Sequence, residues 1–372
     1  MSSPSQIPEI IFILPARFPT EKAYGVTTEY SARALEKIGY LVKILTPEIG
    51  NSRESNIVVE MIGGKIAKVL LSRKLKSILK IRFNLFLILF VVIVRKTLTN
   101  KPRIFWCRDI FLTYLLSIKS NNYVVCEIHR TPLGFQKYFL SKISNNERII
   151  IAPIADFLDN RFKLHPSRTV IAPMGINTHE LKFFDENLSQ KEKVIIYVGL
   201  SNQVGIPLNI NLINDAASRI FESFPDWRVE IIGIDPKNFQ NNISNQCSKN
   251  INIYGFMPRK TVIKMLSRAS IGLVIYPELS WFRDSFPIKI VEYAAASLGI
   301  VASDTTSHRR ILNKSNAIFF DDNSSESLAN SIESLISQSN LRTKISKQAR
   351  LWVEHLTYEN RVQNVINALN NL

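Results

Sequence analysis

The chain has 372 residues and a formal net charge of +16. A hydrophobic content of 46% with 21% charged residues excludes a disordered chain, and the length predicts two domains of ordinary size. The three cysteines are scattered singly, which argues against a disulfide framework and favours a reducing, cytoplasmic setting. No signal peptide is expected, because no charged segment precedes an apolar core at the start. The excess positive charge calls for an anionic partner: nucleic acid, acidic lipid or an anionic substrate.

The first part of the chain alternates short apolar runs with helical patterns. Residues 9–15 predict a buried strand, a helix opened by residues 24–27 stops at Gly39, and residues 41–46 predict a second strand. Gly25 falls at the strand-to-helix turn, where ligands approach doubly wound sheets. Further strands are expected at residues 104–107, 123–129, 148–153 and 169–177.

Between residues 61 and 108 there is no acidic residue. Basic side chains, of which Lys65 is the first and Arg82 the last, precede the apolar run 83–94. As a helix this run would span only about 18 Å, too short for a bilayer core of about 30 Å. The run itself predicts a core helix. The basic segment from Lys65 to Arg82 beside it favours instead a patch that lies on an anionic membrane surface.

The strand expected at 123–129 ends with Glu127, His129 and Arg130 at its carboxyl end, the functional edge of an open sheet. His129 can there donate a hydrogen bond to a bound hydroxyl or phosphate oxygen. The alternative is a structural histidine at a strand end.

The second half restarts the alternation after a charged stretch without periodicity, 181–193, which is interpreted as a linker. Its pattern predicts a second parallel sheet wound on both faces. We expect strands at 194–199, 227–233, 251–255 and 271–277, helices at 208–224 and 261–269, and helical segments at 326–336 and 340–372.

Residues 283–304 read as a polar turn, a helix and a short buried strand. Ser285 is expected to cap the helix, Pro287 to occupy its first turn and Gly299 to close it. Asp284 lies in the turn and Glu292 within the helix. The helix start is an anion site in principle, and the alternative is an ordinary capped helix with solvated acids.

This stretch resembles the acid-x7-Glu signature of the family-four retaining glycosyltransferases, in the variant Ser-x-Pro-x-Lys-x-x-Glu-Tyr carried by Ser285, Pro287, Lys289, Glu292 and Tyr293. The resemblance implies the GT-B fold, an α/β architecture of two Rossmann-like doubly wound domains that face an interdomain cleft. The expected parts are an acceptor-side domain at 1–180, the linker at 181–193, a nucleotide-sugar-binding domain at 194–345, and a C-terminal helix at 346–372 that crosses back to the first domain.

The resemblance also implies roles for individual residues. Asp284 would orient the donor sugar and Glu292 would hold the ribose. Lys289 and the amides near Phe286, Pro287 and Ile288 would stabilise the departing diphosphate. The remaining expected site residues are Gly199 at the diphosphate loop, Gly255, Phe256 and Met257 at the nucleotide base, and His129 and Gly25 at the reacting face.

Two departures from the family pattern stand out. Asp284 occupies a position where the family usually has Glu, which shortens the reach to the sugar. After Gly199 the family commonly carries an arginine and then a lysine, whereas residues 200–205 contain neither. Lys289 and Arg283 are the candidates to replace them.

The sequence therefore predicts transfer of a sugar from a UDP- or GDP-linked donor to a glycan or lipid-linked acceptor, in synthesis of cell-surface polysaccharide or glycolipid. No metal ion and no other cofactor are expected. The predicted location is cytoplasmic, at the inner face of the membrane. Nucleic acid is not an expected partner, because the basic residues lie beside an aliphatic run and are not interleaved with aromatics. The alternative is an inactive GT-B module that binds a sugar or a partner.

Overall fold

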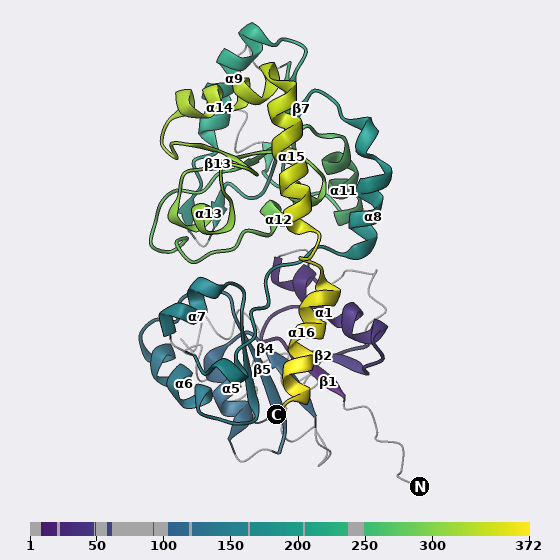
Figure 1. The fold of residues 1–372 in the computed structure, drawn as a ribbon, viewed down its shortest axis with the longest axis vertical. Coiled ribbons are helices and arrows are strands. Elements are labelled where there is room, and N and C mark those ends of the chain that lie inside the picture. The colour runs from purple at the N-terminus through teal and green to yellow at the C-terminus, as the bar shows by residue number, and fades with distance from the viewer. Residues whose placement is uncertain are drawn as a thin grey trace. The chain divides into compact units, whose positions relative to one another are not determined.

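The computed structural model describes residues 9–20, 23–47, 49, 58–61, 92, 103–118, 121–162, 164–203, 205–236 and 249–372. The chain divides into two compact units (Figure 1). Unit 1 consists of Met1–Met174 and Tyr358–Leu372, and unit 2 consists of Gly175–Thr357.

Unit 1 contains a parallel six-stranded sheet in the order β3-β2-β1-β4-β5-β6. This order reverses between β1 and β4, as in doubly wound nucleotide-binding folds. Strands β1 and β4, at the centre of the sheet, and the edge strand β6 are short apolar runs with every residue buried, as parallel sheets covered on both faces require. The strands are β1 (Ile10–Ile13), β2 (Val42–Thr46), β3 (Val58–Met61), β4 (Ile104–Cys107), β5 (Tyr123–Ile128) and β6 (Ile149–Pro153).

The last helix of the chain completes the core of unit 1. Helix α16 lies against α1 (Figure 1). Its apolar side chains Val362 and Val365 join a buried cluster with Leu35 of α1 and with Phe12 and Trp106 of the sheet. The helices of unit 1 are α1 (Ala23–Lys37), α5 (Ile110–Ser117), α6 (Phe135–Ser144), α7 (Asp156–Phe162), the 3-10 turn η1 (Pro166–Arg168) and α16 (Tyr358–Asn370).

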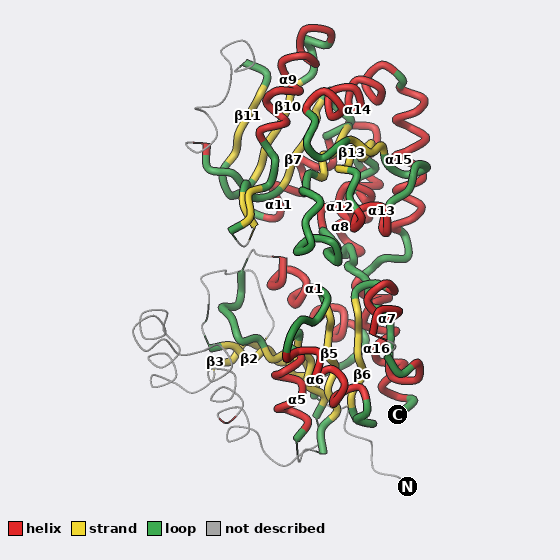
Figure 2. The backbone as a smooth tube through the Cα atoms, turned by 90° about the vertical axis from the view of Figure 1, so that its left-hand side faces the viewer, coloured by secondary structure: helices red, strands yellow, loops and turns green. Residues whose placement is uncertain are grey.

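Unit 2 repeats the architecture with a parallel sheet in the order β11-β10-β7-β12-β13-β14. Figure 2 shows the strands of each unit as a yellow layer with red helices around it. The strands are β7 (Val194–Val198), β10 (Arg228–Ile232), β11 (Ile251–Tyr254), β12 (Ile271–Val274), β13 (Gly299–Ser303) and β14 (Ile318–Phe320), with a small hairpin of β8 (Asn202–Gln203) and β9 (Ile206–Pro207).

The helices of unit 2 include two that sequence periodicity did not indicate, α8 and α13. The set is α8 (Thr178–Glu186), the 3-10 turn η2 (Leu188–Gln190), α9 (Asn211–Ser223), α11 (Arg259–Arg268), α12 (Ile288–Ala295), α13 (Thr306–Ile311), α14 (Ser325–Ser337) and α15 (Ser339–Val353).

The boundary between the units differs from the expected one. The chain leaves unit 1 after Met174, and the stretch 181–193, expected to be a linker, contains most of α8 and all of η2 within unit 2. Asn177 caps α8 by accepting a hydrogen bond from the His179 amide, and Phe184 is its one buried residue. A helix with so narrow a buried face leaves little apolar periodicity in the sequence. The return crossing lies at Thr357, so only α16, and not all of 346–372, belongs to unit 1.

The strand expected at 169–177 does not form. The Val170 amide donates to the Ile151 carbonyl (3.0 Å) and the Ala172 amide to the Pro153 carbonyl (2.8 Å), so the chain runs beside β6. Pro173 has no N–H with which to continue such a ladder.

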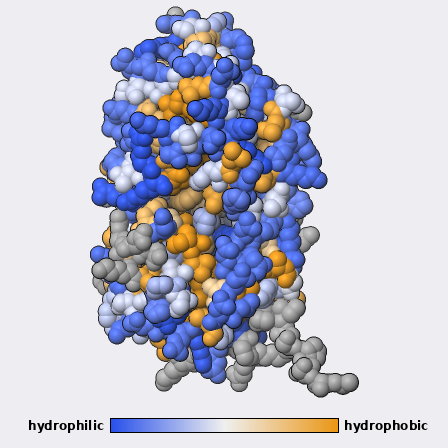
Figure 3. Space-filling model, in the orientation of Figure 1, coloured by the Kyte–Doolittle hydropathy of each residue, from blue (hydrophilic) through white to orange (hydrophobic). Residues whose placement is uncertain are grey.

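The basic segment from Lys65 to Arg82 and the apolar run 83–94, apart from Val92, lie outside the described residues. Within the described part of the chain, no helix has the length and apolarity needed to cross a membrane. On the face drawn in Figure 3, hydrophilic side chains surround separate apolar patches, as is usual for globular proteins.

Candidate functional site

The turn before α12 places Asp284 and Ser285 as expected but caps the helix differently. Pro287 is the N-cap residue of α12, and no side chain makes a capping hydrogen bond there. The Ser285 hydroxyl instead donates to the Phe282 carbonyl (2.7 Å), within the turn. The prediction that Ser285 caps the helix is therefore wrong, because the preceding turn already uses its hydroxyl.

The other end of α12 also departs from expectation. Ser297, with φ of 54°, adopts the left-handed conformation after the helix, and the Leu298 amide donates to the Tyr293 carbonyl (3.0 Å). Gly299 does not close the helix and is the first residue of β13.

Lys289 is the second residue of α12, and its ammonium group is enclosed within unit 2. Only 6% of the residue is exposed. Its Nζ atom lies 4.3 Å from the centroid of the Tyr197 ring and 5.1 Å from that of Tyr276. No hydrogen-bond partner for Nζ is found among the described residues. Burial lowers the pKa of Lys289 to about 7, and the Glu292 carboxylate acts in the opposite direction. A buried ammonium group without a hydrogen bond is costly, so an anionic ligand would satisfy it.

Gly199 forms the wall of the space around this ammonium group. It follows β7, one of the two strands that flank the reversal in strand order. A Cβ atom at this position would lie 2.6 Å from Lys289 Nζ and 2.9 Å from the Tyr197 hydroxyl oxygen. A side chain at position 199 would therefore have to displace the Lys289 ammonium group, at the sheet position where doubly wound folds bind ligands.

Glu292 is buried and paired with Arg259. Arg259 is the first residue of α11, and two of its nitrogens also contact the Glu180 carboxylate, at 3.0 and 2.7 Å. One guanidinium group thus bridges two carboxylates and fixes Glu292 in place.

Asp284 is buried as well and is paired with Arg310 of α13, with 2.9 Å between Nη1 and Oδ1. Arg283, expected to assist the diphosphate, is half-exposed, and its Nε atom lies 3.7 Å from the Glu278 carboxylate. Sequence reasoning missed both Arg259 and Arg310. Neither stands in a recognisable motif, and their partners become visible only in the folded chain.

The expected nucleotide-base loop follows β11. Phe256 is 65% exposed and Met257 is half-buried. The Gly233 amide donates to the Gly255 carbonyl (3.1 Å), and a Cβ at Gly233 would lie 2.7 Å from the Gly199 carbonyl oxygen. The base loop and the Gly199 loop therefore both lie against Gly233, each at the carboxyl end of its strand.

In unit 1, Gly25 lies within the first turn of α1. A Cβ atom there would lie 2.4 Å from both the carbonyl oxygen and the Cγ2 atom of Thr20. Close packing of the loop before α1 accounts for this glycine, and that side of the residue offers no room for a ligand.

His129 directly follows β5, at the carboxyl edge of the sheet as expected. Its Nε2 atom lies 2.7 Å from Oε2 of Glu127, which is fully buried. Burial and the Arg108 charge lower the pKa of His129 to about 4, although Glu127 acts in the opposite direction. The ring is therefore neutral at pH 7.

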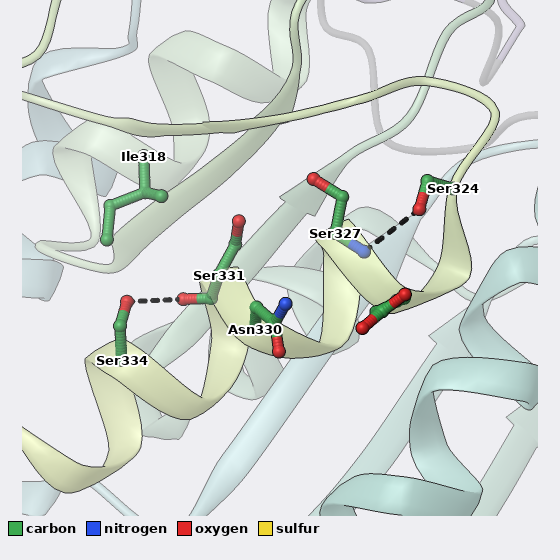
Figure 4. A pocket seen from close by; sticks show the side chains of 7 residues that line it. Ile318, Ser324, Ser327, Asn330, Ser331 and Ser334 are labelled. Carbon is green, nitrogen blue, oxygen red and sulfur yellow. Dashed lines mark hydrogen bonds between the residues drawn. The ribbon is translucent and has the colours of Figure 1, made fainter.

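A shallow groove on α14 is separate from these residues. Its lining includes the serines Ser324, Ser327, Ser331 and Ser334 (Figure 4). The Ser327 amide donates to the Ser324 hydroxyl (3.1 Å), and the Ser334 hydroxyl to the Ser331 carbonyl (2.9 Å). These groups cap and pack the helix. Within the described residues, no group of three or more His, Cys, Asp or Glu side chains is arranged to hold a metal ion.

Comparison with known proteins agrees with this architecture. Residues 178–352, which include the Lys289 site, match the family model described as Glycosyl transferases group 1. No curated protein matches the sequence.

Several solved structures share the fold over nearly their whole length. A glycosyltransferase from Rickettsia africae ESF-5 is 15% identical, with a TM-score of 0.68 and 98% of each chain covered. Sucrose-phosphate synthase from Thermosynechococcus elongatus is 13% identical, with a TM-score of 0.70 and 98% of each chain covered. Anabaena Alr3699/HepE in complex with UDP is 12% identical, with a TM-score of 0.69, covering 98% of this chain and 100% of that one.

The shared architecture of two parallel-sheet α/β units is the GT-B fold, which confirms the predicted fold class. The family match and the fold together support assignment of the chain as a glycosyltransferase, EC class 2.4.

Proposed function

We propose that the chain is a retaining glycosyltransferase that moves a sugar from a UDP- or GDP-linked donor to a hydroxyl group of a glycan or lipid-linked acceptor, in the synthesis of cell-surface polysaccharide or glycolipid. The observation that carries the proposal is the buried Lys289 ammonium group, which lies beside Gly199 and has no hydrogen-bond partner in the part of the chain that the structure describes. The UDP complex of Anabaena Alr3699/HepE, a protein of the same fold, supports a nucleotide-sugar donor.

The proposed roles follow the positions of the side chains. Lys289 and the amides near Phe286, Pro287 and Ile288 take the negative charge that develops on the diphosphate as it leaves. Glu292, held by Arg259, accepts hydrogen bonds from the ribose hydroxyls, and Asp284 orients the donor sugar. The proposed role of His129 is to contact the sugar.

In the proposed reaction, the bond between the anomeric carbon and the diphosphate oxygen breaks and the acceptor oxygen bonds to that carbon from the same face. The acceptor proton passes to the departing phosphate oxygen. Lys289 supplies positive charge at the leaving group, so we propose that transfer needs no metal ion and persists in EDTA.

A thermal-shift screen against UDP-, GDP- and ADP-sugars tests the donor class. We expect stabilisation by a UDP- or GDP-sugar that disappears in Lys289→Met, whereas the exposed control Lys264→Met keeps it. Transfer to a hydroxyl acceptor, with the product anomer assigned by NMR, then tests retention. Failure of every nucleotide-sugar to stabilise the chain would contradict the proposal.

The second candidate is an inactive GT-B module that binds a sugar or a partner. Two observations favour it: residues 200–205 carry no cation, and both carboxylates of the acid pair already have arginine partners. Donor binding without transfer or hydrolysis, across acceptor panels, would favour this candidate.

We also propose that the basic segment from Lys65 to Arg82, which lies outside the described residues, contacts an anionic membrane surface. Its charge and the neighbouring apolar run support this. Co-sedimentation with vesicles containing phosphatidylglycerol, compared with phosphatidylcholine vesicles and with an oligonucleotide at matched salt, tests it. Preference for the oligonucleotide would contradict it.

A further inference from the structure

The carboxylate of Glu127 is the centre of a buried cluster in unit 1. Oε1 accepts a hydrogen bond from Trp106 Nε1 (2.7 Å) and is paired with Arg361 Nη2 (2.8 Å). Oε2 contacts His129 Nε2 (2.7 Å) and Arg108 Nε (2.9 Å). Two hydrogen bonds, from Trp106 and His129, and two ion-pair contacts, with Arg108 and Arg361, therefore surround the carboxylate.

The cluster keeps Glu127 ionised. Burial alone would raise the pKa of Glu127, but the charges of Arg361 and Arg108 and the hydrogen bond from His129 together hold it well below its usual range. An ionised carboxylate only accepts hydrogen bonds. The proton shared by Glu127 and His129 therefore resides on Nε2 of the histidine.

The consequence for His129 is a fixed tautomer. With the proton on Nε2 and a neutral ring, Nδ1 carries a lone pair and can only accept a hydrogen bond. Nδ1 has no hydrogen-bond partner within the described part of the chain, and 22% of the side chain is exposed. Towards a ligand, Nδ1 of His129 can therefore accept a hydrogen bond, whereas from its position in the sequence we expected the side chain to donate one.

Arg361 joins this cluster from the last helix of the chain. It is 2% exposed. Its Nη1 atom donates to the Ser31 hydroxyl of α1 (3.0 Å), and its Nε atom to the Ala172 carbonyl (3.2 Å). The guanidinium group is therefore held by α1 and by the segment beside β6, while Nη2 forms the ion pair with Glu127. Of the two arginines in the cluster, it is the more deeply buried.

We propose that Arg361 is a positioning residue for His129. Arg361 acts through Glu127 to keep the proton of His129 on Nε2, so that Nδ1 accepts a hydrogen bond from a hydroxyl group of the bound sugar. The part concerning the sugar rests on the proposed function, whereas the tautomer does not.

Histidine-selective 15N NMR of the full chain without ligand tests the tautomer directly. The chain contains five histidines, and loss of one signal set in His129→Ala assigns His129. At pH 7 we expect a protonated Nε2 and an unprotonated Nδ1 in the unaltered chain. A protonated Nδ1 or a charged ring would overturn the proposal without any variant.

Arg361→Met tests the contribution of the arginine, and we expect it to move the His129 nitrogens towards averaged values as the tautomer preference weakens. Arg361→Lys, which retains the charge, should restore much of the preference. Glu359→Gln on the same helix removes the ion pair with Lys37 and should leave His129 unchanged. If Arg361→Met does not fold, Glu127→Gln provides the same test at nearly constant volume. A His129 spectrum unaltered by the variants of the cluster would overturn the proposal.

Transfer kinetics provide a second and separable measurement. In Arg361→Met we expect kcat to fall by about tenfold or more with the donor KM changed less than about twofold, because a displaced Nδ1 disturbs the reacting sugar more than the nucleotide. An equal fall in Glu359→Gln would indicate a general effect on α16 and would contradict the specific role. Absence of any transfer would contradict the proposed function, while the NMR result would still decide the tautomer.

Discussion

Unit 1 and unit 2 place charged side chains at the carboxyl ends of sheets with the same strand order, but they satisfy those charges in opposite ways. In unit 1 the Glu127 carboxylate is surrounded by four nitrogens, so its charge is balanced before any ligand binds. In unit 2 the Lys289 ammonium group lies beside two aromatic rings and has no hydrogen-bond partner among the described residues. The comparison separates a buried charge that is balanced by neighbouring side chains from one that makes no hydrogen bond to the described residues.

The largest expected effect concerns the stability of unit 1. Glu127→Ala leaves Arg108 and Arg361 buried without their common anion, which should lower the free energy of unfolding by about 3–5 kcal/mol. Urea denaturation at pH 7, followed by tryptophan fluorescence, measures the change. The exposed Glu147→Ala serves as control. A loss below about 1 kcal/mol would show that the cluster is not an electrostatic unit.

In unit 2 the corresponding change should have the opposite effect on stability. Lys289→Met removes a buried ammonium group that has no hydrogen-bond partner among the described residues. We therefore expect a gain in stability of about 1–3 kcal/mol near pH 7, together with a loss of transfer activity of about 100-fold or more. The pKa of Lys289 is about 7 in the folded chain, below its ordinary value of 10.5. The unfolded chain therefore holds this proton more tightly, and the gain should be complete below pH 7 and vanish as the pH approaches 10.5.

Denaturation of Lys289→Met and the unaltered chain at pH 6, 8 and 10 measures this difference. A variant that is less stable than the unaltered chain at pH 6 would mean that the ammonium group is satisfied within the folded chain.

A smaller effect is expected from Gly199→Ala. The added methyl group would lie 2.6 Å from Nζ of Lys289 and must displace it. Because a misplacement of about 1 Å costs up to about 100-fold, we expect kcat/KM for the donor to fall between about tenfold and 100-fold. The affinity for the free nucleoside, which lacks the diphosphate, should change much less. If the variant weakened the nucleoside as much as the donor, the methyl group would be disturbing a part of unit 2 other than the Lys289 ammonium group.

The smallest expected effect is the pH dependence of donor binding. With a pKa of about 7, the protonated fraction of Lys289 falls about tenfold between pH 6 and pH 8. The dissociation constant of a UDP- or GDP-sugar should rise by up to about tenfold over this range, as measured by calorimetry. Lys289→Met should bind weakly with no such slope. His129, with a pKa of about 4, should add no dependence there.

Much of this comparison could be anticipated from local sequence. The apolar runs that became β1, β4, β7 and β13 are short and fully or almost fully buried, and their order indicated two doubly wound sheets. The positions of Lys289 in α12 and of His129 after β5 also followed from local pattern. The roles of Ser285 and Gly299 did not, because helix caps depend on the particular turn that the neighbouring residues adopt.

The sequence by itself determined the elements whose cause is local: the buried strands, the breaks between them, and the lysine and acids gathered around one helix. Only the tertiary structure decided which charges meet. Nothing in the local sequence around Arg361 or Arg259 indicates an ion pair. In the structure each arginine is paired with a carboxylate from a distant part of the chain. The free energy of a buried charge depends on its neighbours in space, and these are fixed only when the sheet and the last helix pack together.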